Sequence, residues 1–152
     1  MRASNLKFSQ DVICAFARFA LGVAFLSAVA DRFGLWGAHG APSVVWGDMV
    51  HFFVYTRHLT LLFSYRVSLI LAWTATVAEV LLGLSLLVGY RVKTTSVLSG
   101  LLLVVFGAAM AFATGPKSPL DASVFSAAAA SLLLSFQEPD RFTLDARRYG
   151  CR

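Results

Sequence analysis

The sequence predicts an all-α membrane protein: a polytopic four-helix bundle with an interfacial helix in the first extracytoplasmic connection. Of the 152 residues, 58% are hydrophobic and only 14% are charged. The mean hydropathy of +0.72 is too high for a soluble domain of this size, which could not bury that much apolar surface. Apolar stretches recur along the chain that are long enough to cross a hydrocarbon core of ~30 Å as helices. We therefore interpret residues 1–152 as a single membrane domain.

The first predicted span covers residues 12–30, after a short polar lead, and contains a single charge, Arg18. A basic lead, an apolar run and small residues at 28–30 also fit a cleavable signal peptide. Arg18 would interrupt the apolar region of such a signal. This favours retention of the segment as a span.

Residues 31–66 form one long connection that includes Trp36 and Trp46, a glycine-rich piece and a second, largely apolar half. We predict an interfacial helix in the second half, starting near Pro42, with the tryptophans as anchors at headgroup level. A buried re-entrant hairpin is the alternative.

The second predicted span covers residues 67–90 and has one acid, Glu79, at its centre. A helix of this length rises roughly 36 Å, enough to cross a bilayer with some tilt. An isolated carboxylate at the midplane costs at least ~2.5 kcal/mol, so it must face the bundle interior and either find a partner or be protonated.

Two further spans are predicted over residues 96–114 and 119–136. The first carries no charge. The second begins with a typical helix start, Ser118 as N-cap and Pro119 at the first helical position. Residues 137–152 are a polar, basic tail without periodicity.

Four spans place both termini on the same side of the membrane. The basic residues of that side are Arg2, Lys7, Arg91, Lys93, Arg141, Arg147, Arg148 and Arg152, and those of the other side are Arg32, Arg57, Arg66 and Lys117. The positive-inside rule then predicts cytoplasmic N- and C-termini and an extracytoplasmic 31–66 connection. The net charge of +5 is explained by lipid headgroups at the span ends, so the expected partner is a lipid bilayer and not nucleic acid.

Arg18 and Glu79 are the first pair of candidate site residues. The two spans run in opposite directions, and the expected depth difference of roughly 5 Å is one that an arginine side chain can bridge. We predict a buried Arg18–Glu79 salt bridge. One interpretation is that the pair only fixes the helix register, and the other is that it lines a polar pocket for a quinone headgroup or a proton.

A second candidate site is an outer polar cluster of Asp31, Arg32, Lys117 and Asp121, all expected at the outer ends of spans. As a cluster they could bind an anionic or quinone-like ligand. Individually, Asp121 could serve in a capping box, and Arg32 and Lys117 could extend along the helix to the interface.

The sequence does not favour a metal centre or an intrinsic cofactor. His51 and His58 are seven residues apart, which on a helix separates them by roughly 10 Å, too far for one ion. No predicted span contains a histidine for haem. Cys14 fits a small core residue better than a reactive thiol, and Cys151 lies far from it. No nucleophile triad, phosphate loop or dinucleotide fingerprint is present.

Several segments resemble the DoxX family of small bacterial membrane proteins. They are ARFALGVAFL, AEVLLGLSLLVGYRVKT and KSPLDASVF, within residues 12–136. The resemblance implies a four-helix bundle in the bacterial inner membrane. It also implies an association with redox chemistry, since the family includes the membrane subunit of a thiosulfate:quinone oxidoreductase. The 31–66 connection is longer than expected of a minimal member.

The sequence thus leads to two main functional hypotheses. The first is a redox-associated subunit of a quinone-linked oxidoreductase that interacts with the quinone pool, together with a soluble redox partner or a second copy of the chain. The alternative is a non-catalytic scaffold that docks a soluble extracytoplasmic partner. A small-molecule carrier is disfavoured, because neither broken helices nor inverted repeats are visible.

Overall fold

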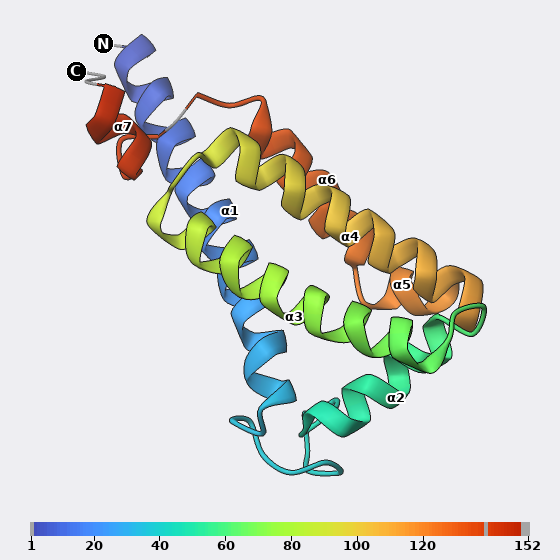
Figure 1. Ribbon diagram of the computed structural model, residues 1–152. Coiled ribbons are helices and arrows are strands. Elements are labelled where there is room, and N and C mark those ends of the chain that lie inside the picture. Colours follow the sequence, from blue (N-terminus) through green and yellow to red (C-terminus); the bar gives the residue numbers. More distant parts are fainter. Residues whose placement is uncertain (1, 139, 150–152) are drawn as a thin grey trace.

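The computed structural model describes residues 2–138 and 140–149, and this part of the chain is helical, without strands. Its elements are α1 (Arg2–Arg32), α2 (Met49–Leu59), α3 (Tyr65–Val88), α4 (Val92–Thr114), α5 (Lys117–Asp121), α6 (Val124–Ser135) and α7 (Leu144–Tyr149). Figure 1 shows α3 lying across α1, and α6 lying along α4. The all-α prediction is confirmed for the described residues.

Three of these helices are long and apolar enough to cross a membrane: α1 from Leu6, α3 and α4. They correspond to the predicted spans over 12–30, 67–90 and 96–114. The first helix is longer than predicted, because the polar lead continues it to Arg2. α3 ends at Gly89, whose left-handed backbone (φ 69°) favours glycine, and the amide of Tyr90 donates to the carbonyl of Ser85.

The predicted fourth span over 119–136 is not one continuous helix. It is divided into α5 and α6 by Ser123, which adopts a left-handed backbone (φ 54°). α6 has 12 residues and rises only about 18 Å. The break lets α6 pack closely along α4. There the ring of Phe125 lies where a side chain at Gly107 would otherwise be, 2.7 Å from the position of its Cβ.

The predicted helix of the 31–66 connection exists as α2, but it begins at Met49 and not near Pro42. Asp48 caps it, since its Oδ1 accepts a hydrogen bond from the amide of His51 at 2.8 Å. α2 packs against α3, where the hydroxyls of Thr60 and Ser68 lie 2.7 Å apart.

The tail that was predicted to lack regular structure is part of the fold. Asp140, Thr143 and Asp145 are buried, and α7 follows them. Thr143 is an N-cap whose Oγ1 accepts from the amide of Ala146 at 3.0 Å. Figure 1 shows α7 at the same end of the molecule as the first turns of α1.

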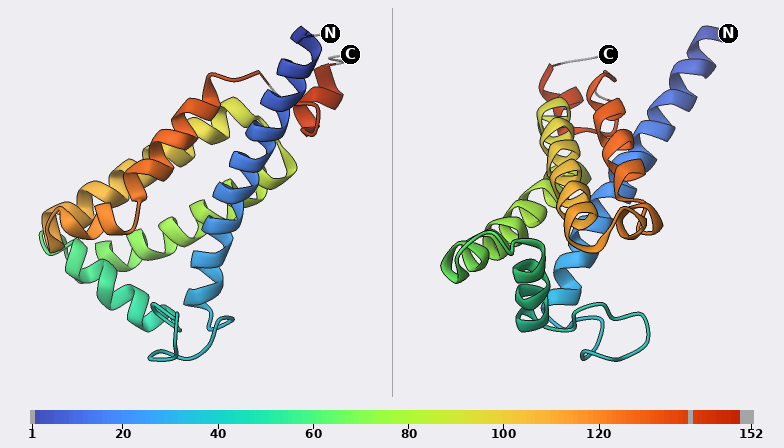
Figure 2. Two further views of the ribbon diagram at one scale, coloured as in Figure 1. Left: turned by 180° about the vertical axis from the view of Figure 1, so that it is seen from behind. Right: turned by 90° about the vertical axis from the view of Figure 1, so that its right-hand side faces the viewer.

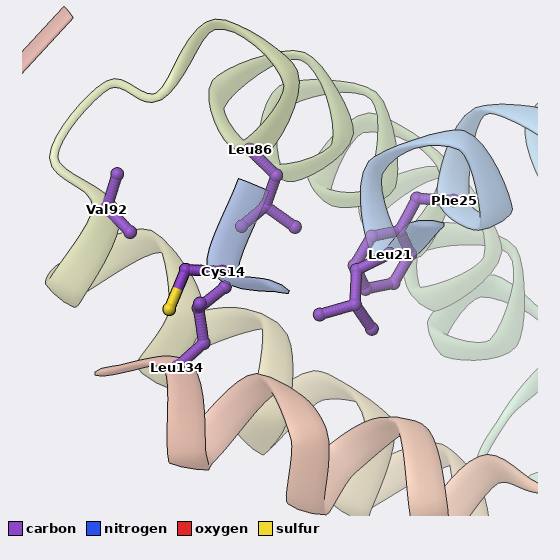
Figure 3. Close-up of a cluster of buried hydrophobic side chains, with 6 residues drawn as sticks. All are labelled: Cys14, Leu21, Phe25, Leu86, Val92 and Leu134. Atoms are coloured by element: carbon purple, nitrogen blue, oxygen red, sulfur yellow. The ribbon is translucent and has the colours of Figure 1, made fainter. Parts of the chain in front are cut away.

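α1 and α3 approach each other closely at two glycines. A Cβ on Gly22 would lie 2.9 Å from the carbonyl oxygen of Gly83, and a Cβ on Gly83 would lie 3.1 Å from that of Gly22. Small residues of this kind let membrane helices approach closely. Next to the crossing, a buried apolar cluster connects four helices (Figure 3); it consists of Cys14, Leu21, Phe25, Leu86, Val92 and Leu134. Cys14 is thus a core residue, as predicted.

Candidate functional site

The predicted Arg18–Glu79 salt bridge is wrong, because each residue has a different partner. Arg18 pairs with Asp140, with 3.0 Å between Nε and Oδ2, and Glu79 pairs with Arg32, with 2.7 Å between Oε2 and Nη1. All four side chains are buried. The structure therefore contains two buried ion pairs where the sequence predicted one.

The position of the helix crossing explains the exchange of partners. α1 and α3 are antiparallel and touch at Gly22 and Gly83. Arg18 lies one turn before Gly22 and so faces the turn after Gly83, whereas Glu79 lies one turn before Gly83 and faces the other side of the crossing. Along the helix axes, Arg18 and Glu79 are therefore separated by the length of about eight helical residues, or roughly 12 Å, instead of the expected 5 Å.

The Arg18–Asp140 centre, formed by these two residues and the carbonyl of Leu86, is fully hydrogen-bonded. Arg18 binds the carboxylate through Nε and through Nη2 (3.2 Å to Oδ1), and its Nη1 donates to the carbonyl of Leu86 at 2.6 Å. Asp140 Oδ1 also accepts from the amide of Phe142. Because the carbonyl of Leu86 is near the end of α3, the guanidinium also stabilises the negative end of that helix. The centre thereby joins α1, α3 and the tail.

The tail also caps α4. The carboxylate of Asp145 accepts from the amides of Arg91 and Val92 at 2.9 and 2.8 Å. Thr143 lies against Gly89, where a Cβ would come within 2.7 Å of the threonine side chain. Both contacts hold the α3–α4 turn in place.

The Arg32–Glu79 centre lies on the other side of the helix crossing. Arg32 Nη2 donates to Glu79 Oε1 at 2.9 Å, and its Nη1 donates to the hydroxyl of Thr76 at 2.9 Å. Two rings of the 31–66 connection cover the guanidinium: its Cζ lies 3.6 Å from the ring centre of Phe52 and 5.2 Å from that of Trp46. A cation over aromatic faces is stabilised by the ring quadrupoles.

Asp31 holds this cover in place. Its Oδ2 accepts from the amides of Val45 and Trp46 at 3.1 and 2.9 Å. Trp46 in turn packs edge-on against Phe52, with 5.2 Å between the ring centres. The end of α1 therefore provides both the cation and the anchor of the loop above it.

Three buried polar atoms at this centre lack a hydrogen-bond partner: Asp31 Oδ1, Arg32 Nε and Glu79 Oε2. Glu79 Oε2 is close to Arg32 Nη1, but the two are not aligned for a hydrogen bond. Buried polar atoms are nearly always paired, so a cluster of three without partners calls for an explanation. A donor and an acceptor beneath two aromatic rings can bind a flat, polar ligand.

The predicted outer polar cluster does not form as a unit. Asp31 and Arg32 belong to the Arg32–Glu79 centre, whereas Lys117 and Asp121 pair with each other on α5, with 86% and 64% of their side chains exposed. This exposed i,i+4 pair is a weak surface interaction. The break at Ser123 separates α5 from α6, so Lys117 and Asp121 lie on a separate short helix and not on the first turn of a continuous span.

Sequence reasoning missed Asp140, Thr76, Trp46 and Phe52 as neighbours of the buried arginines. For Asp140 a signal exists: it lies three residues before Thr143, whose N-cap pattern indicates a further helix and hence an ordered tail. The other three depend on where the connection folds back.

The histidines lie on the outer side of α2 and its preceding loop. The rings of His39 and His51 stack with 3.6 Å between their centres, and His51 Nδ1 lies 2.9 Å from the carboxylate of Asp48. Hydrogen bonds from the backbone and ring of His51 hold the pKa of the Asp48 carboxyl below its usual value. In the described ranges, no three His, Cys, Asp or Glu side chains lie close enough together to hold a metal ion.

No protein-family model matches the chain, and no curated protein or solved structure matches it significantly.

Proposed function

We propose that the protein is a four-helix inner-membrane protein in which α1, α3, α4 and the α5–α6 pair each cross the bilayer. α6 alone rises only about 18 Å, so α5 would have to contribute the remaining part of the fourth crossing. α7 and the start of α1 lie at one end of the molecule, which fits an even number of crossings with cytoplasmic termini (Figure 1). α2 would lie at the extracytoplasmic headgroups.

Within this protein, the Arg32–Glu79 centre would bind the headgroup of a membrane quinone, as part of a redox-associated subunit. The observation that carries the proposal is the donor Arg32 Nε, which is buried beneath Phe52 and Trp46 without a hydrogen-bond acceptor, next to the carboxylate of Glu79, whose Oε2 makes no hydrogen bond. A quinone offers a flat ring for the aromatic side chains and carbonyl oxygens for the guanidinium. The resemblance to the DoxX family points to the same role.

The proposed chemistry assigns a task to each residue. Reduction of a quinone to a quinol needs two electrons and two protons. Arg32 would orient the headgroup by donating to a carbonyl oxygen, and Glu79, in the middle of α3, would pass protons to it. The electrons would come from the redox centre of a soluble partner protein. The headgroup would enter when Trp46 and the 33–48 loop move aside.

Quinone binding can be measured directly through Trp46. The full chain is reconstituted into nanodiscs and titrated with a soluble short-chain quinone, which quenches the fluorescence of a nearby indole. We expect saturable quenching, and we expect Glu79→Gln to weaken the affinity at least about tenfold, because the charge-assisted hydrogen bond from Arg32 to Glu79, which positions the guanidinium for the quinone, is lost. Trp46→Phe should remove most of the quenching without the same loss of affinity in a competition assay.

Two variants serve as controls. Asp121→Asn removes an exposed acid of the α5 ion pair and should leave the affinity unchanged. Glu79→Asp keeps the charge and should retain part of the affinity. If wild type shows no saturable quenching, or if Glu79→Gln binds as tightly as Asp121→Asn, the quinone proposal is rejected.

The second candidate function is that of a non-catalytic scaffold that docks a soluble partner. The exposed apolar residues of the 31–66 connection favour it. Leu35 and Val50 are 76% and 68% exposed, and they lie outside the three candidate spans. Under this hypothesis, the double variant Leu35→Ser/Val50→Ser should release a co-purifying partner, while Glu79→Gln should retain it. The reverse pattern would favour the quinone site.

A further inference from the structure

A groove runs between α3 and α4, on the face of α3 that points away from α1. It has a volume of about 610 Å³, within the range of ~300–1,000 Å³ that is typical of ligand sites. The two helices touch near the turn at residues 89–91 and separate as they leave it (Figure 2). The groove therefore opens from the turn toward the middle of the spans.

The walls of the groove change character along its length. Away from the turn they are apolar: Leu81, Leu82, Leu98, Leu101, Leu102 and Val105. At the turn they include Arg91 and Thr94, both exposed, next to Tyr90. A site with a cationic, polar end and a long apolar end matches a molecule with a charged head and a hydrocarbon chain.

The length and the level of the groove fit one leaflet of a bilayer. The turn joins two helices that can each cross a membrane, so Arg91 lies at the membrane surface. From Thr94 to Val105, α4 rises roughly 16 Å, close to half of a ~30 Å hydrocarbon core. A single lipid of that leaflet would fill the groove from the headgroup to the end of its acyl chain.

The charge at the polar end selects the headgroup. The guanidinium of Arg91 forms no ion pair with any residue that the structure describes, and its nearest ring contact is Tyr90, with 5.9 Å between Cζ and the ring centre. The backbone of Arg91 is fixed by Asp145, which holds the residue at the mouth of the groove. An exposed cation at the membrane surface that forms no ion pair attracts a phosphate that carries a net negative charge.

We propose that the α3–α4 groove is a binding site for one anionic phospholipid, with its headgroup at Arg91 and an acyl chain between the two helices. Glu79 faces α1 and not the groove, so this site is separate from the Arg32–Glu79 centre and does not depend on the proposed quinone binding.

Native mass spectrometry of the full chain in mild detergent tests the site. Phosphatidylglycerol and phosphatidylcholine with identical acyl chains are the probes. We expect one phosphatidylglycerol to bind about fivefold more tightly than phosphatidylcholine, the factor expected for one arginine near an anionic headgroup. Arg91→Gln should abolish the preference, and Arg91→Lys should restore most of it.

Lys93→Gln is the matched control, because Lys93 is an exposed cation in the first turn of α4 that does not line the groove. It should keep the preference. Ala78→Trp and Leu101→Trp each fill the groove from one wall and should weaken the binding of both lipids about tenfold. Unchanged melting curves would show that these variants are folded.

Three results would overturn the proposal. They are equal affinity of wild type for the two lipids, an equal loss of preference in Lys93→Gln and Arg91→Gln, and undiminished binding in both folded tryptophan variants. Displacement of the lipid by a second copy of the chain at higher protein concentration would likewise reassign the groove to a dimer interface.

Discussion

The two buried ion pairs of this protein share the same chemistry but differ in how completely they are satisfied. Arg18 donates through Nε, Nη1 and Nη2 to Asp140 and to the end of α3, and none of the buried side-chain atoms of this centre lacks a partner. At the Arg32–Glu79 centre, three buried polar atoms have none. Buried ion pairs that are fully hydrogen-bonded suit a structural role, whereas unmet hydrogen-bonding capacity suits a site.

The surroundings of the two centres reinforce the difference. The Arg18–Asp140 centre is closed by the tail, which caps α4 through Asp145. The Arg32–Glu79 centre is covered by Trp46 and Phe52 of the long connection, whose loop is attached through Asp31. Loops held by a few hydrogen bonds open more readily than packed helices. Only the second centre is therefore arranged to admit a ligand.

The largest expected effect comes from breaking the ion pairs themselves. Removal of one partner leaves a buried, uncompensated charge, so Arg18→Ala should lower the free energy of unfolding by about 3–5 kcal/mol. Double-mutant cycles of Arg18→Ala with Asp140→Ala and of Arg32→Ala with Glu79→Ala, measured by reversible unfolding in mixed micelles, give the two coupling energies. We expect the larger coupling at Arg18–Asp140. An equal or larger value at Arg32–Glu79 would contradict the contrast drawn here.

A smaller effect is expected at the helix crossing that separates the centres. The Cβ of Gly22→Ala would lie 2.9 Å from the carbonyl oxygen of Gly83 and from Cγ of Leu87, so α1 and α3 must move apart. The free energy of unfolding should fall by about 1–3 kcal/mol, the usual cost of overpacking. Ala24→Leu, on an exposed face of α1, is the control and should leave the unfolding curve unchanged. A Gly22→Ala protein as stable as this control would show that the contact is not tight.

The smallest effect concerns the cap that the tail places on α4. Asp145→Ala removes acceptors from the amides of Arg91 and Val92 and should cost about 0.5–2 kcal/mol. Hydrogen exchange should speed up at these two amides and leave Trp46 unaffected, since the other centre does not use the tail. Asp121→Ala, in an exposed ion pair, should change nothing measurable. Faster exchange at Trp46 would mean that the two regions are coupled.

The three long helices could be predicted from the sequence because hydropathy and length decide them locally. Gly89 and the basic turn after it mark the end of α3, and Glu79 was recognised as a buried acid that needs a partner. The identity of the partner could not be predicted, since an arginine on either side of the Gly22–Gly83 crossing satisfies the same requirement. The break at Ser123 was missed because Ser118 and Pro119 indicate a helix start equally well for a long or a short helix.

By itself, the sequence determined that the chain is helical, that three of its segments suit a bilayer, and that Arg18 and Glu79 are buried charges. These properties follow from the composition of each segment and the high cost of an unpaired charge in an apolar medium. Only the tertiary structure decided which charges meet. The pairing depends on where two helices cross and on a tail and a loop that fold back from distant parts of the chain, and neither is encoded in the composition of any single segment.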